Sequence, residues 1–273
     1  MSIVTSLVAD FVAATAELDD LVASIGDAAW SIPTPAPRWT IAHQIAHLSW
    51  TDRVSVCAAT DPGGFAEVIE AAVGNPLGFA DATAAEGAAQ PPKQILDQWR
   101  HARRELARAL VSVPEGEKIA WFGPPMSAAS MATARLMEVW AHGLDIADAL
   151  DAHVPVTDRI RSVVHLGVRT RDYAYMVNGR TAPPRPFRYE ITAPSGTRWT
   201  WGPDDPDAVD GVVRGPAFDF CALVTQRRAV TDLDLEFIGE HARQWSGIAQ
   251  CFAGPPGPGR ESVRAAHINE MTR

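Results

Sequence analysis

The sequence predicts an α+β protein in which an up-down four-helix bundle is followed by a smaller domain with an antiparallel sheet. Two observations predict this arrangement. Up to about residue 152 the chain is rich in Ala and Leu, and its apolar residues recur at helical spacing. From about residue 183 it gains Pro, Trp, Thr and Gly, and the apolar spacing changes to two. Because 273 residues are enough for two domains, we place them at 1–152 and 153–273.

Four long helices are predicted in the first domain. In the first helix, the apolar residues from Leu7 to Ile25 lie on one face. Thr40 is placed to cap the second helix, and Pro92 and Pro114 bracket the third. The predicted helices cover residues 3–25, 41–60, 92–112 and 128–151, and the connection at 61–91, rich in Ala, Gly and Pro, can carry short helices.

The second domain is predicted to mix helices with short strands. Apolar residues alternate on both sides of a turn at 193–196, which predicts a β-hairpin. A Gly- and Pro-rich segment near the carboxyl end cannot continue a helix. The other predicted elements are a helix at 157–178, a strand at 208–214, a helix at 216–227 and a last helix at 233–252.

Composition excludes several classes of protein. With 24 basic and 33 acidic residues the net charge is -9, which disfavours nucleic acid as a partner. No apolar run approaches the roughly 20 residues of a membrane-spanning helix, and the amino terminus lacks a signal-peptide pattern. The three cysteines are far apart and odd in number, so no disulfide framework is expected. We expect a cytoplasmic protein, monomeric or homodimeric, with no membrane partner.

The fourth predicted helix carries a polar stripe on a largely apolar background. Glu138 and His142 are four residues apart, so their side chains share one face. Arg135 and Asp145 extend that face by one turn on each side. Burying such a stripe is costly unless its members pair with each other or bind something. The stripe by itself therefore has two interpretations, a buried salt-bridge network and a metal site.

The second predicted helix adds two histidines, His43 and His47, again four residues apart. With Glu138 and His142, His47 makes a set of two imidazoles and one carboxylate. Three protein ligands leave one coordination position open, which is typical of a catalytic metal site. His43 is three residues after Thr40, where a capping-box side chain belongs, so we interpret it as a capping residue or a support for the ligands.

Two motifs carry a resemblance to a known family. Trp39 and Thr40 precede Ala46-His47-Leu48, and the fourth helix contains RLMEVWAHGLDI from Arg135 to Ile146. At these residues the chain resembles the mycothiol-dependent maleylpyruvate isomerase group. That group is part of the wider DinB-like superfamily of metal-binding four-helix bundles, and the second half of the chain is similar to sterol-carrier-like α+β domains.

The resemblance implies a divalent metal, most simply zinc, on His47, Glu138 and His142. It also implies a low-molecular-weight thiol, mycothiol, as cosubstrate for a small-molecule substrate. Arg135 and Asp145 are then interpreted as supports that orient Glu138 and His142 respectively.

Arg227 is the catalytic candidate in the second half. Leu223-Val224-Thr225-Gln226-Arg227 resembles a recurrent Thr-Gly-Arg pattern of the family, with Gln226 in the glycine position. The resemblance implies an anion-binding arginine that holds a carboxylate through two hydrogen bonds. A solvated arginine at a helix end is the alternative.

The function expected from these residues is a metal-dependent thiol transferase or isomerase, in which a metal-bound thiolate attacks a small electrophile. An apolar-ligand binding protein with a structural metal is one alternative, and a fourth protein ligand would favour it. A metal-dependent hydrolase is another, with the ion activating water and Glu138 or Asp145 moving the proton.

Overall fold

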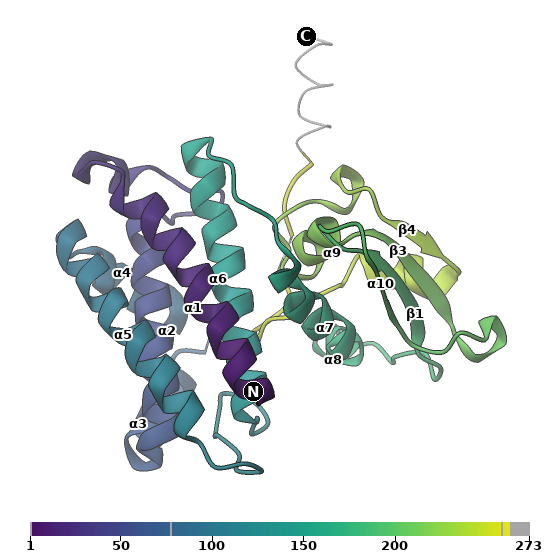
Figure 1. The fold of residues 1–273 in the computed structure, drawn as a ribbon, viewed down its shortest axis with the longest axis horizontal. Coiled ribbons are helices and arrows are strands. Elements are labelled where there is room, and N and C mark those ends of the chain that lie inside the picture. The colour runs from purple at the N-terminus through teal and green to yellow at the C-terminus, as the bar shows by residue number, and fades with distance from the viewer. Residues whose placement is uncertain (1, 77, 258, 263–273) are drawn as a thin grey trace, which may run out of the picture. The chain divides into compact units, whose positions relative to one another are not determined.

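The fold was analysed in a computed structural model that describes residues 2–76, 78–257 and 259–262 (Figure 1). Contacts within the chain divide it into two compact units, Met1–Val154 and Pro155–Arg273. The first unit is helical, and the second combines helices with one four-stranded sheet. The predicted α+β fold class is therefore confirmed.

Four long helices and two shorter ones build the first unit. Helix α2 packs against α5, α6 and α4, and α1 packs against α6 and α5. The fully buried side chains include Phe11, Ile45, Trp99 and Leu106, one from each of α1 and α2 and two from α5. Burying each of these contributes about 1.5–3 kcal/mol to folding. The helices are α1 (Ile3–Ala23), α2 (Ile41–Thr60), α3 (Pro62–Gly74), α4 (Phe79–Ala88), α5 (Pro92–Ser112) and α6 (Ala128–Leu150).

The directions of the long helices differ from the predicted up-down alternation. Figure 1 shows α1 and α6 running one way and α2 and α5 the other. The reason lies in the connection at 61–91, where α3 and α4 return the chain to the start of α2. A hydrogen bond from Trp39 to Asp81 ties α4 to this end of α2, so α5 begins there and runs parallel to α2.

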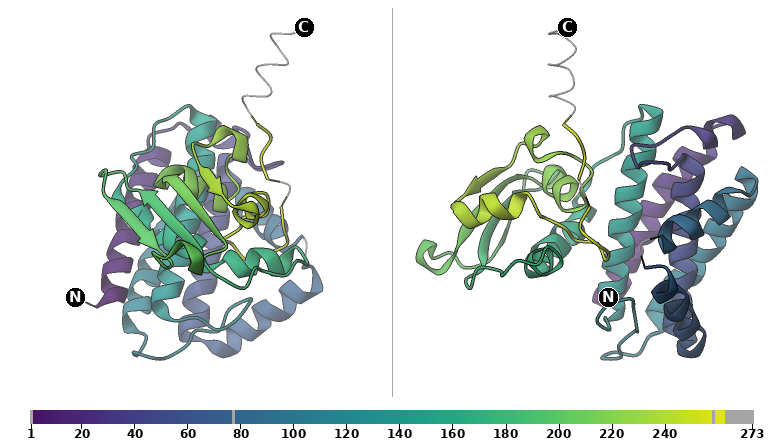
Figure 2. Two further views of the ribbon diagram at one scale, coloured as in Figure 1. Left: turned by 90° about the vertical axis from the view of Figure 1, so that its right-hand side faces the viewer. Right: turned by 180° about the vertical axis from the view of Figure 1, so that it is seen from behind.

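The second unit contains a mixed sheet with the strand order β2-β1-β3-β4. Its strands lie side by side in one layer (Figure 2). Helices α9 and α10 cover one face, where Phe220 and Trp245 pack on Tyr189 of β1. The elements are α7 (Arg161–Arg169), α8 (Arg171–Val177), β1 (Phe187–Thr192), β2 (Arg198–Trp201), β3 (Gly211–Pro216), α9 (Ala217–Val224), β4 (Glu236–Ile238) and α10 (Glu240–Ser246).

The sequence predicted an antiparallel sheet, and this prediction is wrong in part. The hairpin of β1 and β2 is antiparallel, but β1 and β3 are parallel. After β2 the chain passes the beginning of β1, where Asp210 N–H donates to the Pro186 carbonyl at 3.0 Å. Strand β3 therefore starts at the same end as β1 and runs in the same direction.

Two predicted helices are wrong in part. The helix expected over 157–178 is divided into a short 3-10 turn, α7 and α8. The helix expected over 233–252 begins instead with β4, which pairs with β3 along the edge of the sheet. Gly239, at a φ of 92°, then turns the chain into the short α10. Pairing with an existing strand edge has overridden the local helical pattern.

Among the described helices, none combines the length and the apolar character needed to cross a bilayer.

Candidate metal centre

Helices α2 and α6 bring His47, Glu138 and His142 together; we call these three residues the triad. Glu138 and His142 are one turn apart on α6, and His47 faces them from α2, which runs in the opposite direction. One potential ligand atom from each residue lies within 4.8 Å of the other two. Within the described parts of the chain, no other group of three His, Cys, Asp or Glu side chains is arranged in this way.

The spacing of the triad fits a tetrahedral cation. Nε2 of His47 is 3.5 Å and Nε2 of His142 is 3.1 Å from the same oxygen, Oε2 of Glu138. Two ligand atoms that each lie about 2.1 Å from a tetrahedral zinc ion are about 3.4 Å apart. Two imidazole nitrogens and a carboxylate oxygen are also ligand types that zinc accepts. The ligand types and these two separations therefore suit a zinc-like ion.

The electrostatics of Glu138 favour its ionised form. Burial raises the pKa of this carboxyl, but hydrogen bonds from His142 and His47 and the positive charge of Arg135 outweigh that effect. The pKa of Glu138 consequently lies well below its usual value. Arg135 Nη2 is 3.7 Å from Oε1, so the guanidinium and the histidines face different oxygens of one carboxylate.

A glutamine that the sequence analysis did not single out orients His142. Gln44 Nε2 donates to Thr34 Oγ1 at 2.8 Å and lies 3.5 Å from Asp145 Oδ2. Because Gln44 Nε2 lies toward the oxygens of Thr34 and Asp145, the other end of the amide, Oε1, faces His142 Nδ1 and can only accept from it. Nδ1 therefore carries a proton, and the lone pair of Nε2 becomes available once any second proton leaves.

Besides its Nε2 contact with Glu138 Oε2, His47 is held by aromatic packing. Its ring centroid lies 5.2 Å from that of Trp39 and 6.5 Å from that of Trp50. Trp39 also stacks on His142, with an interplanar angle of 17°. His47 Nδ1 is buried and has no hydrogen-bond partner among the described residues. Aromatic packing thus fixes the His47 ring next to Oε2 of Glu138.

The structure places His43 at the helix start. The backbone N–H of Thr40 donates to His43 Nδ1 at 3.3 Å, which makes the capping box expected from the spacing. Burial lowers the pKa of His43 against the raising effect of Asp81. A neutral imidazole can accept through Nδ1, which is what the cap requires.

Arg227 lies in the second unit, just beyond α9. Its Nη1 donates to the Thr225 carbonyl at 2.7 Å. The preceding Gln226 adopts a left-handed backbone conformation with a φ of 57°. This conformation explains why glycine suits the position, because glycine has no Cβ to strain there.

Asp52 is the second residue that the sequence analysis missed. It does not face the triad cation position, and for that reason the helical spacing did not mark it. It is nevertheless only 1% exposed, and its neighbours include Arg135, Trp99 and Glu138. Asp52 is buried because α5 and α6 pack around this part of α2, and the sequence of α2 alone does not show that packing.

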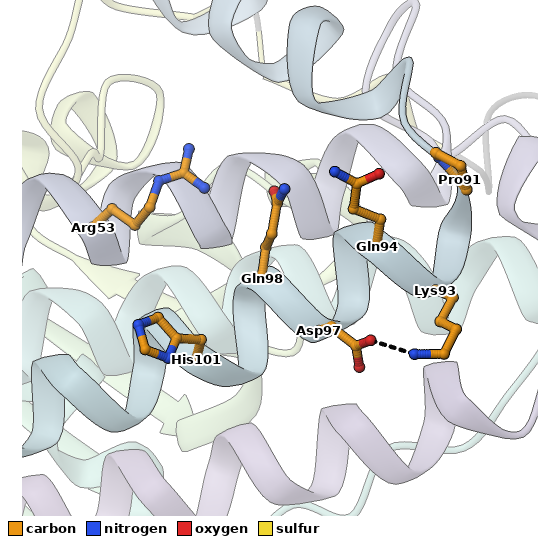
Figure 3. Close-up of a pocket in the computed structure, with 7 residues that line it drawn as sticks. All are labelled: Arg53, Pro91, Lys93, Gln94, Asp97, Gln98 and His101. Atoms are coloured by element: carbon orange, nitrogen blue, oxygen red, sulfur yellow. Dashed lines mark hydrogen bonds and ion pairs between the residues drawn. The ribbon is translucent and has the colours of Figure 1, made fainter.

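A separate hollow of about 620 Å³ lies between α2 and α5 (Figure 3). It is lined by Arg53, Gln94, Gln98 and His101, together with Pro91 and an ion pair between Lys93 and Asp97. Most of these side chains are exposed. Without a buried polar group, this hollow is a weaker candidate than the triad.

Comparison with known proteins identifies the family. The profile of the mycothiol maleylpyruvate isomerase N-terminal domain matches residues 11–147, which include the whole triad. The chain belongs to this family. Two relatives from Mycobacterium tuberculosis, "Uncharacterized protein MT0041" of strain CDC 1551 and "Uncharacterized protein Rv0036c" of strain H37Rv, are each 58% identical over 253 residues. The match covers 93% of this chain and 97% of each relative.

Two solved structures share the fold of this family member. They are crystal structures of the mycothiol-dependent maleylpyruvate isomerase and of a histidine-to-alanine mutant of it. The TM-scores are 0.56 and 0.57, at 16% and 15% identity respectively. Each comparison covers 82% of this chain and 89% of the other. At such low identity the likeness establishes the fold.

Proposed function

We propose that the protein is a zinc-dependent enzyme that joins a low-molecular-weight thiol, mycothiol, to a small electrophile, as a transferase or as an isomerase. The observation that carries this proposal is the convergence of three ligand atoms within 4.8 Å of one another, with both histidine nitrogens at distances from Glu138 Oε2 that suit a tetrahedral ion. Only three protein ligands are brought together within the described residues, which supports an open coordination position. Membership of the family supports mycothiol as the thiol.

The residues around the triad have separate tasks in this proposal. A zinc ion bound there would lower the pKa of a thiol that enters its open position and so supply a thiolate nucleophile. Gln44 keeps the proton of His142 on Nδ1, away from the ion. Arg135 faces Oε1 of Glu138 and leaves Oε2 for the ion.

The overall reaction conserves all atoms of the thiol and the electrophile. In a transfer, the sulfur forms a bond to one carbon of an activated double bond, and the thiol proton ends on the neighbouring carbon. In an isomerisation, the adduct rotates about the former double bond and then releases the thiol. A thiol cosubstrate suits a reducing, cytoplasmic setting, and none of the three cysteines forms a disulfide.

Arg227 is proposed to hold an anionic group of the substrate or of the thiol. Its guanidinium has five N–H donors and can present two of them to one carboxylate. The side chain is half-buried, and its bond to the Thr225 carbonyl orients it. Replacing Arg227 with Ala should therefore weaken substrate or thiol binding while leaving bound metal unchanged.

Metal analysis tests the ligand assignment. Elemental analysis of the purified protein should find about one zinc per chain, and His47→Ala or His142→Ala should each abolish it while helical circular dichroism is retained. His101→Ala on α5 is the matched control and should keep the metal. A triad variant that retains full zinc would refute the assignment.

A thiol-consumption assay over candidate electrophiles then tests the reaction. Turnover should require mycothiol and should be lost in His142→Ala. Turnover of an ester or amide in the absence of any thiol would instead establish a metal-dependent hydrolase.

A further inference from the structure

Behind the triad, between α2, α5 and α6, the bundle buries a group of polar atoms that find no partner in the protein. We call Asp52, Trp99 and Arg135 the buried polar cluster. Asp52 Oδ2, Trp99 Nε1 and both Nε and Nη1 of Arg135 have no hydrogen-bond partner within 3.5 Å among the described residues. Their residues are 1%, 0% and 4% exposed. Trp99 lowers the pKa of the Asp52 carboxyl as a nearby hydrogen-bond donor, and Arg135 lowers it through its positive charge, so the three side chains are neighbours.

This pattern of unpaired atoms indicates a bound water. A buried polar atom without a partner costs about 1–3 kcal/mol, and more than about 90% of such atoms in native proteins are paired. The buried polar cluster contains two unpaired donors of Arg135 and one unpaired acceptor of Asp52, with the Trp99 donor beside that carboxyl. A water molecule accepts hydrogen bonds from two donors and donates to an acceptor, and internal waters typically make about three such bonds.

We propose that the buried polar cluster holds a water molecule that joins Asp52 to Arg135, and that Asp52 is through this link a positioning residue for Glu138. This inference rests on the proposed function, because it assigns Glu138 to the metal. Arg135 Nη2 is 3.7 Å from Glu138 Oε1, whereas Oε2 faces the two histidines. The ring of Trp121, 5.3 Å from the guanidinium carbon, covers a face of Arg135.

Competition between Arg135 and a cation for Glu138 explains why the metal needs Asp52. A guanidinium beside Glu138 competes with a cation for the same carboxylate and also repels that cation. We expect the Asp52 carboxyl to accept from the bridging water and so to draw Arg135 away from full pairing with Glu138. Without Asp52, Arg135 is free to pair more closely with Glu138, and the metal site is weakened.

Metal affinity of Asp52 variants tests the inference. The zinc affinity of the full chain is measured by competition with a chromophoric chelator, and the ligand geometry by the d–d absorption of the cobalt-substituted protein. Asp52→Leu should lower zinc affinity by about 10- to 100-fold and change the cobalt spectrum. Asp52→Asn keeps an oxygen acceptor for the water and should show a smaller loss.

Asp19→Asn is the matched control. Asp19 is also a buried carboxylate, but it pairs with Arg100 and Arg103 across α1 and α5. Its loss should lower stability and leave both the zinc affinity and the cobalt spectrum as in the wild type.

The possible outcomes are distinguishable. Normal zinc binding by the wild type together with unchanged binding by Asp52→Leu would overturn the inference and leave the proposed function standing. A wild type that binds neither zinc nor cobalt would overturn both. A high-resolution crystal structure of the wild type should show a water within hydrogen-bond distance of Asp52 Oδ2 and of Arg135. A dry cluster there would overturn the inference even if Asp52→Leu does not fold.

Discussion

Asp52 is expected to make the metal-free protein less stable as the pH rises, and Asp52→Asn should remove that effect. Burial raises the pKa of this carboxyl from 3.8 to about 7, although Arg135 and Trp99 act to lower it. At a pH between 3.8 and about 7, Asp52 of the folded protein holds a proton that the same residue has released in the unfolded chain. Raising the pH through this window therefore favours unfolding.

The size of the effect follows from the two pKa values. A difference of roughly three pKa units corresponds to about 4 kcal/mol once the pH is above both values. Between pH 5 and pH 8 the expected change is about 2.5 kcal/mol. Because an amide does not ionise, Asp52→Asn should gain this amount of stability relative to the wild type over that interval.

Urea unfolding at pH 5 and pH 8, followed by helical circular dichroism with a chelator present, measures the difference. Asp19→Asn is again the control. Burial raises the pKa of Asp19, but hydrogen bonds and charges from Arg100 and Arg103 outweigh this and lower it. Asp19 is thus ionised at both pH values, and its variant should differ from the wild type equally at each. The same constancy for Asp52→Asn would refute the reasoning.

Two further predictions concern single contacts. Gln44→Leu removes the acceptor for His142 Nδ1 and should weaken zinc binding about 10- to 100-fold in a chelator competition, whereas Gln98→Leu on α5 should not. Gly202→Ala places a Cβ 2.2 Å from a backbone oxygen of β1 at a φ of 84°, and urea unfolding followed by tryptophan fluorescence should show a loss above about 2 kcal/mol. Gly196→Ala has a similar φ and no atom within 4 Å, so an equal loss there would exclude the clash as the cause.

The helices of the first unit could be predicted because their end signals are local. The predicted 41–60 and 92–112 agree with α2 and α5 at both ends. Thr40 caps the first of these through its own neighbours, and Pro92 begins the second. Such signals act within four residues and do not depend on the rest of the fold.

The carboxylate and one imidazole of the triad were also visible in the sequence. Glu138 and His142 must share a face in any helix, because they are four residues apart. Gln44 was not found, although it is three residues before His47 on the same helix. A glutamine carries no distinctive charge or spacing, so its role emerges only when Thr34, Asp145 and His142 surround it.

By itself the sequence determined where the long helices begin and end, which residues share a helical face, and which family motifs the chain carries. These properties depend on interactions between residues a few positions apart. Only the tertiary structure decided that α5 runs parallel to α2 (Figure 1), that residues 236–238 join a sheet edge, and that Asp52 is buried in the electrostatic field of Arg135. Each of these depends on which distant segment packs alongside, and no local pattern contains that information.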